Sequence, residues 1–256
     1  MEKLLQDKTI LVVGAGGLLG LNLVTTSLKQ GARIIAADIN ITVLKMRLKN
    51  SGLNLNSENL ILKKLDLTNE ISVRKLFDNI EHIDGAVNCT YPKNKQYGKK
   101  FFEVTQDSFN ENLSLHLGSS FVFMKNCAMY FQKNKCPFSL VNISSVYGVI
   151  APKFEMYDNT EMTMPVEYAA IKSALLHLNK YVASYIKDCR FRINCVSPGG
   201  IFDNQPNDFI QAYSTYTHGK GMLDVKDVLG AILFLLSDEA KYITAQNIIV
   251  DDGFVL

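Results

Sequence analysis

The sequence predicts an α/β fold in which a doubly wound parallel sheet of about seven strands is covered by helices on both faces. Short apolar runs alternate along the chain with longer helix-like stretches, and strands separated by helices pair in parallel. A glycine-rich turn joins the first apolar run to the first helix, as is typical of this class. The 256 residues, 47% of them hydrophobic, are enough for one domain spanning 1–256.

The predicted strands begin with Thr9–Val13, a buried apolar run. The others are predicted at Arg33–Asp38, Leu60–Asp66, Gly85–Cys89, Phe138–Ser144, Arg192–Val196 and Asn247–Val250. Helices are predicted from the glycine turn to about Gln30 and at about 40–49, 69–80, 106–132, 166–187 and 225–236. This order predicts a Rossmann-type fold, in which ligands bind at the carboxyl ends of the strands.

Composition excludes several classes of protein. The net charge of +2 gives no indication of nucleic-acid binding. No apolar stretch approaches the roughly 18 residues of a membrane span, and Met1–Asp7 lacks the apolar core of a secretion signal, so we expect a cytoplasmic protein without membrane contact. The cysteines are scattered and are predicted to be reduced, mostly buried thiols with no metal site; they stand at 89, 127, 136, 189 and 195.

The glycine-rich turn predicts a pyrophosphate site. In the segment 14–20, GAGGLLG, we expect cofactor contacts from Gly14, Gly17, Leu18, Leu19 and Gly20. Glycines allow the backbone to approach a phosphate closely, and the start of the following helix supplies N–H donors and positive potential. A glycine turn without a ligand is the alternative, but the acidic residue that ends the next strand argues against it.

That acidic residue, Asp38, predicts which dinucleotide binds. A carboxylate at this position accepts from both ribose hydroxyls and repels a 2′-phosphate, and the two residues that follow supply no cation. We therefore expect NAD in preference to NADP. Asp66, with Leu67, is expected to meet the adenine edge, and a helix N-cap before Thr68 is the alternative reading of Asp66.

Tyr168 and Lys172 indicate an acid/base pair. Residues four apart share one face of a helix, which places the Lys172 ammonium beside the Tyr168 phenol. A nearby cation lowers the pKa of a phenol from its usual value of roughly 10. The pairing therefore predicts a phenol that exchanges protons near neutral pH, as the interconversion of an alcohol and a carbonyl requires.

These motifs together resemble the short-chain dehydrogenase/reductase family over essentially the whole chain. The glycine turn, Asp38, Asp66, Asn88, Ser145, Tyr168, Lys172 and the sequence Ser197-Pro198-Gly199 occur in the family's order. Within the family, the segments 141–148, 164–174 and 197–206 are similar to oxidoreductases of the flagellin-modification type, a group that acts in bacterial surface-sugar biosynthesis.

The resemblance implies a role for each matching residue. Tyr168 would be the general acid/base, and Lys172 would lower its pKa and hold the nicotinamide ribose. Ser145 would bind the reacting oxygen. The remaining cofactor contacts implied are Asn88, Pro198, Gly199 and Ile201. The family also implies a homodimer or homotetramer, with the helix near 166–186 at the interface, although packing in the core explains the same residues.

Three departures from the family pattern keep other functions open. An ungapped alignment places His116, where the family has a catalytic asparagine, with Asn112 one turn earlier as the alternative. If it is functional, His116 would relay protons and titrate near neutral pH. The glycine spacing matches the epimerase-like branch, so nucleotide-sugar epimerase or dehydratase chemistry is a second reading. Asp203 replaces a frequent threonine. Together with Val13, Leu18 and His116 it supports a third reading, a NAD-binding partner subunit with little turnover, against which the intact Ser145-Tyr168-Lys172 set argues.

The segments around the predicted cleft indicate the substrate. Residues 91–100 carry four lysines and two tyrosines, which favours an anionic sugar such as a sugar phosphate or nucleotide sugar, with a solvated loop as the alternative. An extended loop, 152–160, is expected over the site, and 202–221 is expected to be a flexible lid. The sequence is also compatible with a pathway partner enzyme that consumes the ketone as it forms, for instance by transamination.

Overall fold

The computed structural model describes residues 3–158 and 160–256 and contains one seven-stranded, fully parallel sheet in the order β3-β2-β1-β4-β5-β6-β7. The strands are β1 Thr9–Val13, β2 Arg33–Asp38, β3 Leu60–Lys64, β4 Gly85–Asn88, β5 Phe138–Ile143, β6 Phe191–Pro198 and β7 Asn247–Val250. The doubly wound fold predicted from the sequence is confirmed. Asn159, in the predicted substrate loop, and Met1 and Glu2 lie outside the described residues.

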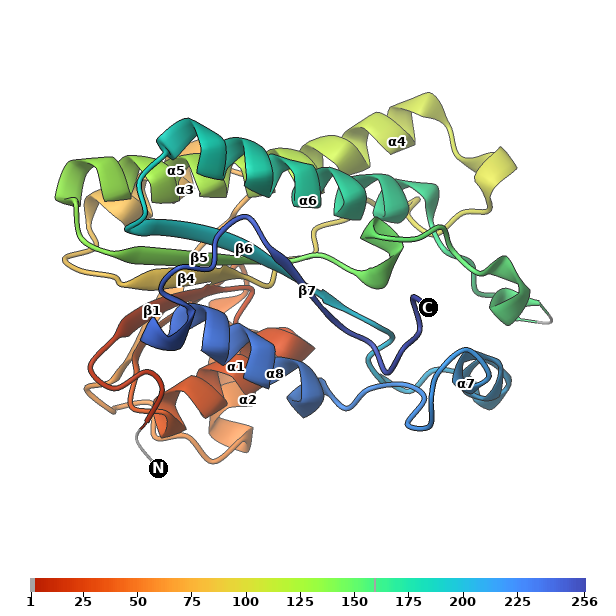
Figure 1. Ribbon diagram of the computed structural model, residues 1–256, viewed down its shortest axis with the longest axis horizontal. Coiled ribbons are helices and arrows are strands. Elements are labelled where there is room, and N and C mark those ends of the chain that lie inside the picture. Colours follow the sequence, from red (N-terminus) through yellow and green to blue (C-terminus); the bar gives the residue numbers. More distant parts are fainter. Residues whose placement is uncertain (1–2, 159) are drawn as a thin grey trace.

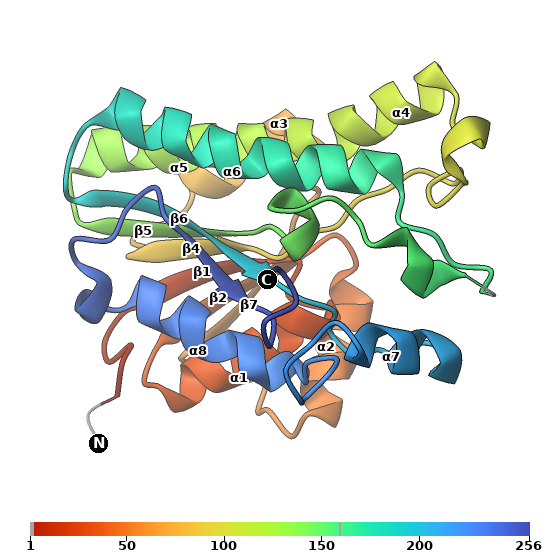
Figure 2. The ribbon, with the colours of Figure 1, turned by 45° about the vertical axis from the view of Figure 1, so that its right-hand side comes forward.

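Helices cover the sheet on both faces (Figures 1 and 2). One face is covered by α1 Leu18–Lys29, α2 Ile41–Asn50 and α8 Val225–Leu236, and the other by α3 Glu70–Asp78, α5 Ser119–Asn134 and α6 Val166–Ile186. Two shorter helices, α4 Gln106–Asn112 and α7 Asn207–Ser214, lie towards the carboxyl ends of the strands. Because both faces are packed, β1 is buried along its whole length, and such strands are continuous apolar runs.

The two sheet faces bury separate apolar clusters. Alternate residues of one strand point to opposite faces, so Ile10 and Val12 pack with α1 and α8, whereas Leu11 and Val13 pack with α3 and α5. Side-chain caps start several helices: Asn40 caps α2, and Asp224 forms a capping box with Asp227 at α8. The starts of these helices are therefore determined by their capping residues, which can be recognised in the sequence.

The structure corrects the long helix predicted at 106–132. A π-helical turn, Leu113–Gly118, separates α4 from α5. The extra residue of a π turn leaves the apolar spacing nearly helical, so periodicity alone does not reveal it. Other differences are smaller: β3 stops two residues before Asp66, and β6 continues to Pro198. Of the five free cysteines, Cys127 and Cys195 are buried and Cys89 is half-buried, but Cys136 and Cys189 are exposed, so the expectation of mostly buried thiols is wrong for these two.

Among the described residues, no helix combines the length and the apolar character that crossing a membrane would need.

Candidate active site

The glycine turn is held tightly between β1, β2 and β4. Gly14 has a φ of +73°, and a Cβ there would lie 2.9 Å from the Cys89 carbonyl oxygen. A Cβ on Gly20 would collide with the Gly14 carbonyl oxygen, so α1 can begin this close to β1 only with glycine at that position. The backbone of the turn therefore packs closely against β4 and α1 without side chains in between. A turn that lacks side chains also lets a phosphate approach its N–H groups.

Asp38 connects the end of β2 to this turn. Its Oδ2 accepts the Gly16 N–H at 2.8 Å, and its Oδ1 accepts the Asn40 N–H at 2.9 Å. The Arg47 guanidinium of α2 donates to the Gly16 carbonyl at 2.6 Å. The two residues after Asp38 do not indicate this cation, because Arg47 lies further along, in α2.

A groove of about 290 Å³ runs along the carboxyl ends of β1 to β4. Its walls include five of the predicted cofactor residues, Gly14, Gly17, Asp38, Asp66 and Leu67. Asp66 also accepts from the Thr68 N–H at 2.9 Å, so it shapes a turn, while the cap of α3 is Asn69. Asn88 is buried and lies outside the groove wall, where it donates to the Ser120 hydroxyl and accepts from Thr90.

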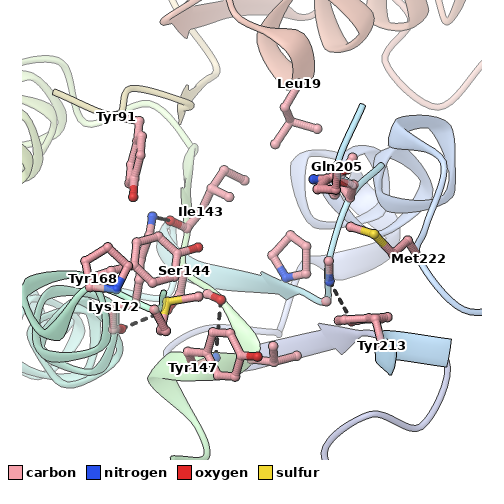
Figure 3. Close-up of a pocket in the computed structure, with 18 of the residues that line it drawn as sticks. Leu19, Tyr91, Ile143, Ser144, Tyr147, Tyr168, Lys172, Gln205, Tyr213 and Met222 are labelled. Atoms are coloured by element: carbon pink, nitrogen blue, oxygen red, sulfur yellow. Dashed lines mark hydrogen bonds between the residues drawn. The ribbon is translucent and has the colours of Figure 1, made fainter. Parts of the chain in front are cut away.

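A second cavity, of about 460 Å³, adjoins the groove and contains the predicted acid/base residues (Figure 3). Its walls include the predicted residues Leu18, Leu19, Ser145, Tyr168, Lys172, Pro198, Gly199 and Ile201. They come from α1, α6 and the segments that follow β5 and β6, which are distant in sequence. Cys89, Thr90 and Tyr91 line both hollows, so the two hollows meet at the segment after β4.

Lys172 is buried beside Tyr168 and bound to the end of β5. Its Nζ donates to the Ile143 carbonyl at 2.8 Å and lies 5.4 Å from the centre of the Tyr168 ring. The Ser144 hydroxyl donates to the Lys172 carbonyl at 2.8 Å, which fixes α6 against the same segment. Burial lowers the pKa of Lys172 to about 8.

The predicted lowering of the Tyr168 pKa is wrong for this structure. Burial raises the pKa of the phenol, because a phenolate loses its hydration there, and hydrogen bonding from Ser145 opposes this only in part. The i, i+4 spacing reveals only that the two groups are neighbours on one helix. The burial of both side chains, which dominates their pKa values, depends on the segments packed around that helix.

His116 lies in the π-helical turn, and its ring meets the Tyr91 ring edge-on with 5.2 Å between the ring centres. Burial, and then the charge of Lys172, lowers the pKa of His116 to about 2. The titration near neutral pH predicted for it is therefore wrong, and the imidazole is neutral. Asn112, the alternative, is buried and donates to Glu167 Oε1 at 3.2 Å. Both residues lie outside the walls of the two hollows.

The substrate side of the cavity consists mainly of residues that the motifs did not predict. Tyr147, Tyr157, Met164, Phe209, Tyr213 and Met222 lie along it. The predicted lid, 202–221, lies over the cavity, but it contains α7, and its Phe209 and Tyr213 are buried in a cluster. These side chains meet only through tertiary packing, and no local spacing could indicate them.

The lysines of 91–100 do not line the cavity. Of the described residues in its wall, Lys172 is the one cationic side chain. Lys93 lies over the rings of Tyr91 and Tyr97, with its Nζ 5.7 and 5.5 Å from their centres, and the hydroxyls of these two tyrosines contact each other. Tyr91 itself stands edge-on to Tyr168, with 5.6 Å between ring centres. The loop therefore contributes an aromatic wall to the reacting centre.

A parallel doubly wound sheet, a glycine turn followed by an acidic residue, and a Ser-Tyr-Lys set beside the groove define a dinucleotide-dependent oxidoreductase. The chain belongs to the short-chain dehydrogenase/reductase family: residues 17–255 match the family model described as enoyl-(acyl carrier protein) reductase. It is 37% identical to post-translational flagellin modification protein A of Campylobacter coli over 99% of this chain and 100% of that protein.

Other relatives agree with this membership. The chain is 27% identical to a probable galactose dehydrogenase of Rhizobium meliloti, over 97% of this chain and 95% of that one. Its structure is similar to that of a short-chain dehydrogenase from Leptospira borgpetersenii with bound NAD+, with a TM-score of 0.85 and 29% identity over 98% of this chain and 94% of that one.

The buried Lys172 leads to a prediction about stability. The Lys172→Met variant is expected to unfold with a free energy higher than wild type by up to about 3 kcal/mol at about pH 7, because it removes a buried charge. The lysine pKa falls from 10.5 to about 8 on folding. Below about pH 8 Lys172 is protonated in both the folded and the unfolded state, so the full cost of burying its charge is present. Between about 8 and 10.5 only the unfolded state holds the proton, so wild-type stability rises with pH and the difference disappears.

Urea unfolding of both proteins at about pH 7 and about pH 10 checks this prediction. Lys180→Met, at an exposed position of the same helix, is the matched control and is expected to show the same small difference at both pH values. A Lys172→Met difference that does not change with pH would contradict the argument.

Proposed function

We propose that this protein is a NAD-dependent oxidoreductase that moves hydride between nicotinamide and a secondary alcohol or ketone of a sugar. One observation carries the proposal: Ser145, Tyr168 and Lys172 lie in one cavity that joins a groove containing Asp38. The nicotinamide would supply or accept the hydride. The protein would supply the proton, the orientation of the reacting oxygen and the exclusion of water.

Each of the three residues has a distinct role in this proposal. The Tyr168 phenol donates its proton to the ketone oxygen or accepts one from the alcohol, and the Ser145 hydroxyl orients that oxygen. Lys172 presents its ammonium to the cavity while the Ile143 carbonyl fixes it, and it holds the nicotinamide ribose. Its positive charge favours the phenolate and so offsets part of the effect of burial on Tyr168. His116 stays neutral and shapes the Tyr91 side of the site.

The preference for NAD rests on the carboxylate of Asp38. Held by the Gly16 and Asn40 N–H groups, it faces the groove where an adenosine ribose would lie, and its charge repels a 2′-phosphate. The Arg47 guanidinium is bound to the Gly16 carbonyl. Arg47 does not line the groove, so its charge does not offset that of Asp38 there.

For the substrate, we propose a sugar phosphate or nucleotide sugar of bacterial surface-glycan or flagellin-glycan biosynthesis. The full-length similarity to flagellin modification protein A supports the pathway, and the lysines of 91–100 support the charge. The cavity wall is mostly aromatic and apolar, so the sugar ring would enter it and the anionic part would stay towards the loop. Tyr91 would contact the ring.

A homo-oligomer is part of the proposal. Tyr181 and Tyr185 stack on the outer face of α6 and are 61% and 72% exposed, and Met129 is exposed on α5 beside it. Apolar side chains on two adjacent helices fit a contact with a second copy in a dimer or tetramer. A pathway enzyme that consumes the ketone is expected as a further partner.

Titration of the purified protein with NADH and NADPH, followed by absorbance assays, tests the proposal. The panel contains UDP-glucose, UDP-N-acetylglucosamine, GDP-mannose and hexose phosphates. We expect tighter binding of NADH and turnover with at least one sugar. Preference for NADPH would overturn the Asp38 argument. A product changed in stereochemistry or dehydrated without net NADH change would favour the epimerase or dehydratase alternative, and binding without turnover would favour a non-catalytic partner subunit.

A further inference from the structure

The C-terminal segment, Asp251–Val255, lies behind the wall of the cavity. It follows β7, and Figure 1 shows the chain ending beside the carboxyl end of that strand, between the sheet and α7. Asp251 closes the segment into a turn, since its carboxylate accepts the Gly253 N–H at 3.0 Å and the Val255 N–H at 2.9 Å. The segment therefore has a defined shape, and none of its residues lines the cavity itself.

Phe254 forms a second layer behind two tyrosines of the cavity wall. It is fully buried, its ring stacks on Tyr213 at 4.6 Å between centres, and it meets Tyr147 edge-on at 5.9 Å. The Tyr213 hydroxyl in turn accepts the Gly200 N–H at 2.6 Å. Phe254 thus supports both the lid helix and the segment after β6 from a position that a substrate cannot reach.

Asp252 holds the last turn of the predicted lid. Its Oδ2 accepts three consecutive N–H groups, those of Gly219 at 3.1 Å, Lys220 at 2.5 Å and Gly221 at 3.2 Å. Its carbonyl accepts the His218 N–H at 2.9 Å. These donors, first that of Lys220, keep the pKa of the Asp252 carboxyl below its usual value. Three converging N–H groups form an anion-binding concavity, and here the chain's own carboxylate fills it.

Lys153 connects the same segment to the extended loop before α6. Its Nζ donates to the Phe254 carbonyl at 2.8 Å and lies 4.6 Å from the centre of the Phe254 ring. It also lies 4.7 Å from the centre of the Tyr216 ring in the lid. The C-terminal segment therefore joins the three parts of the chain that surround the substrate side of the cavity.

We propose that the segment Asp251–Val255 is a positioning element that sets the shape of the substrate side, with Asp252 and Phe254 as positioning residues. Asp252 fixes the lid end and Phe254 fixes Tyr213 and Tyr147, so the segment controls sugar affinity without contact with the sugar. None of the residues in these contacts lines the groove that contains Asp38, where the adenosine half of the dinucleotide would lie. The kinetic part of this inference rests on the proposed function, whereas the structural part does not.

Asp252→Gly is the variant that tests the element. Asp252 has a φ of +54°, which glycine adopts without strain. The variant therefore removes the carboxylate while the backbone can keep its conformation. We expect about a tenfold rise in KM for the fastest sugar of the panel, since charge-assisted hydrogen bonds are lost, with a smaller change in kcat. The Kd for NADH is expected to stay within about twofold. Trypsin cleavage after Lys220 is expected to become faster.

Two further variants complete the design. Asp252→Asn keeps one acceptor oxygen and tolerates the same φ, so it should restore part of the lost sugar affinity. Leu256→Ala, at the residue directly after the segment and 87% exposed, is the matched control and should behave as wild type. Unchanged KM and unchanged cleavage in Asp252→Gly would overturn the proposal. So would a parallel loss of NADH binding, because that would indicate general damage to the fold.

The cleavage assay separates the two possible failures. If wild-type protein turns over none of the sugars, the proposed function fails, and faster cleavage of Asp252→Gly after Lys220 still supports the positioning element. If wild type is active and both the KM and the cleavage rate of the variant are unchanged, the positioning element fails alone.

Discussion

Replacing Tyr168 with phenylalanine is expected to lower kcat by about 10²- to 10⁴-fold, the usual contribution of a general acid/base. The ring stays and only the hydroxyl is lost, so its edge contact with Tyr91 and the packing of α6 are retained. NADH affinity is expected to stay within about twofold, because the groove around Asp38 is untouched. Single-turnover absorbance measurements with a saturating sugar separate this loss from any change in binding.

The matched control is Tyr157→Phe. Tyr157 lines the same cavity and carries a buried hydroxyl, whose donation to the Tyr147 hydroxyl at 3.3 Å would be lost. Because the proposed mechanism gives the Tyr157 hydroxyl no part in proton transfer, its loss should change KM more than kcat. Wild-type turnover in Tyr168→Phe would remove Tyr168 from the mechanism, and an equal loss of kcat in both variants would mean that the effect is not specific to the proton donor.

Gly20→Ala is expected to lower the free energy of unfolding by about 1–3 kcal/mol, as forced overpacking does, and to weaken NADH binding at least tenfold. The added methyl would point into the Gly14 carbonyl, which is backbone and cannot rotate away. Either α1 moves off β1 or the glycine turn opens, and each change moves the N–H groups that would hold the pyrophosphate. Urea unfolding and NADH titration measure the two effects separately.

Gly230→Ala is the control for helix propensity. Gly230 lies inside α8, and a Cβ there would meet nothing within 4 Å, so alanine is expected to stabilise the protein by about 0.5–1 kcal/mol. If Gly20→Ala unfolded at the same urea concentration as wild type and bound NADH equally well, the close approach of α1 to the glycine turn would be refuted.

The sequence was sufficient to predict the fold because strand burial and helix amphipathicity are local. In a sheet packed on both faces, the central strands are largely apolar runs, as β1 is, whereas the edge strands β3 and β7 are only partly buried. All seven strands could still be located from the sequence. The positions of Asp38, Tyr168 and Lys172 could also be predicted, since parallel strands place their carboxyl ends at one edge. The π-helical turn before α5 was not predictable, because one inserted residue hardly changes apolar spacing.

What the sequence determined by itself is therefore the order of the elements, the glycine turn and the identity of the groups that meet at the sheet edge. Tertiary structure alone decided their electrostatics: burial raises the pKa of Tyr168, lowers that of Lys172 to about 8 and keeps His116 neutral. It also decided the aromatic substrate wall and the support of that wall by Phe254. The local sequence contains the apolar periodicity that determines helices and strands. The desolvation of a group and its long-range contacts depend instead on the distant parts of the chain that pack around it.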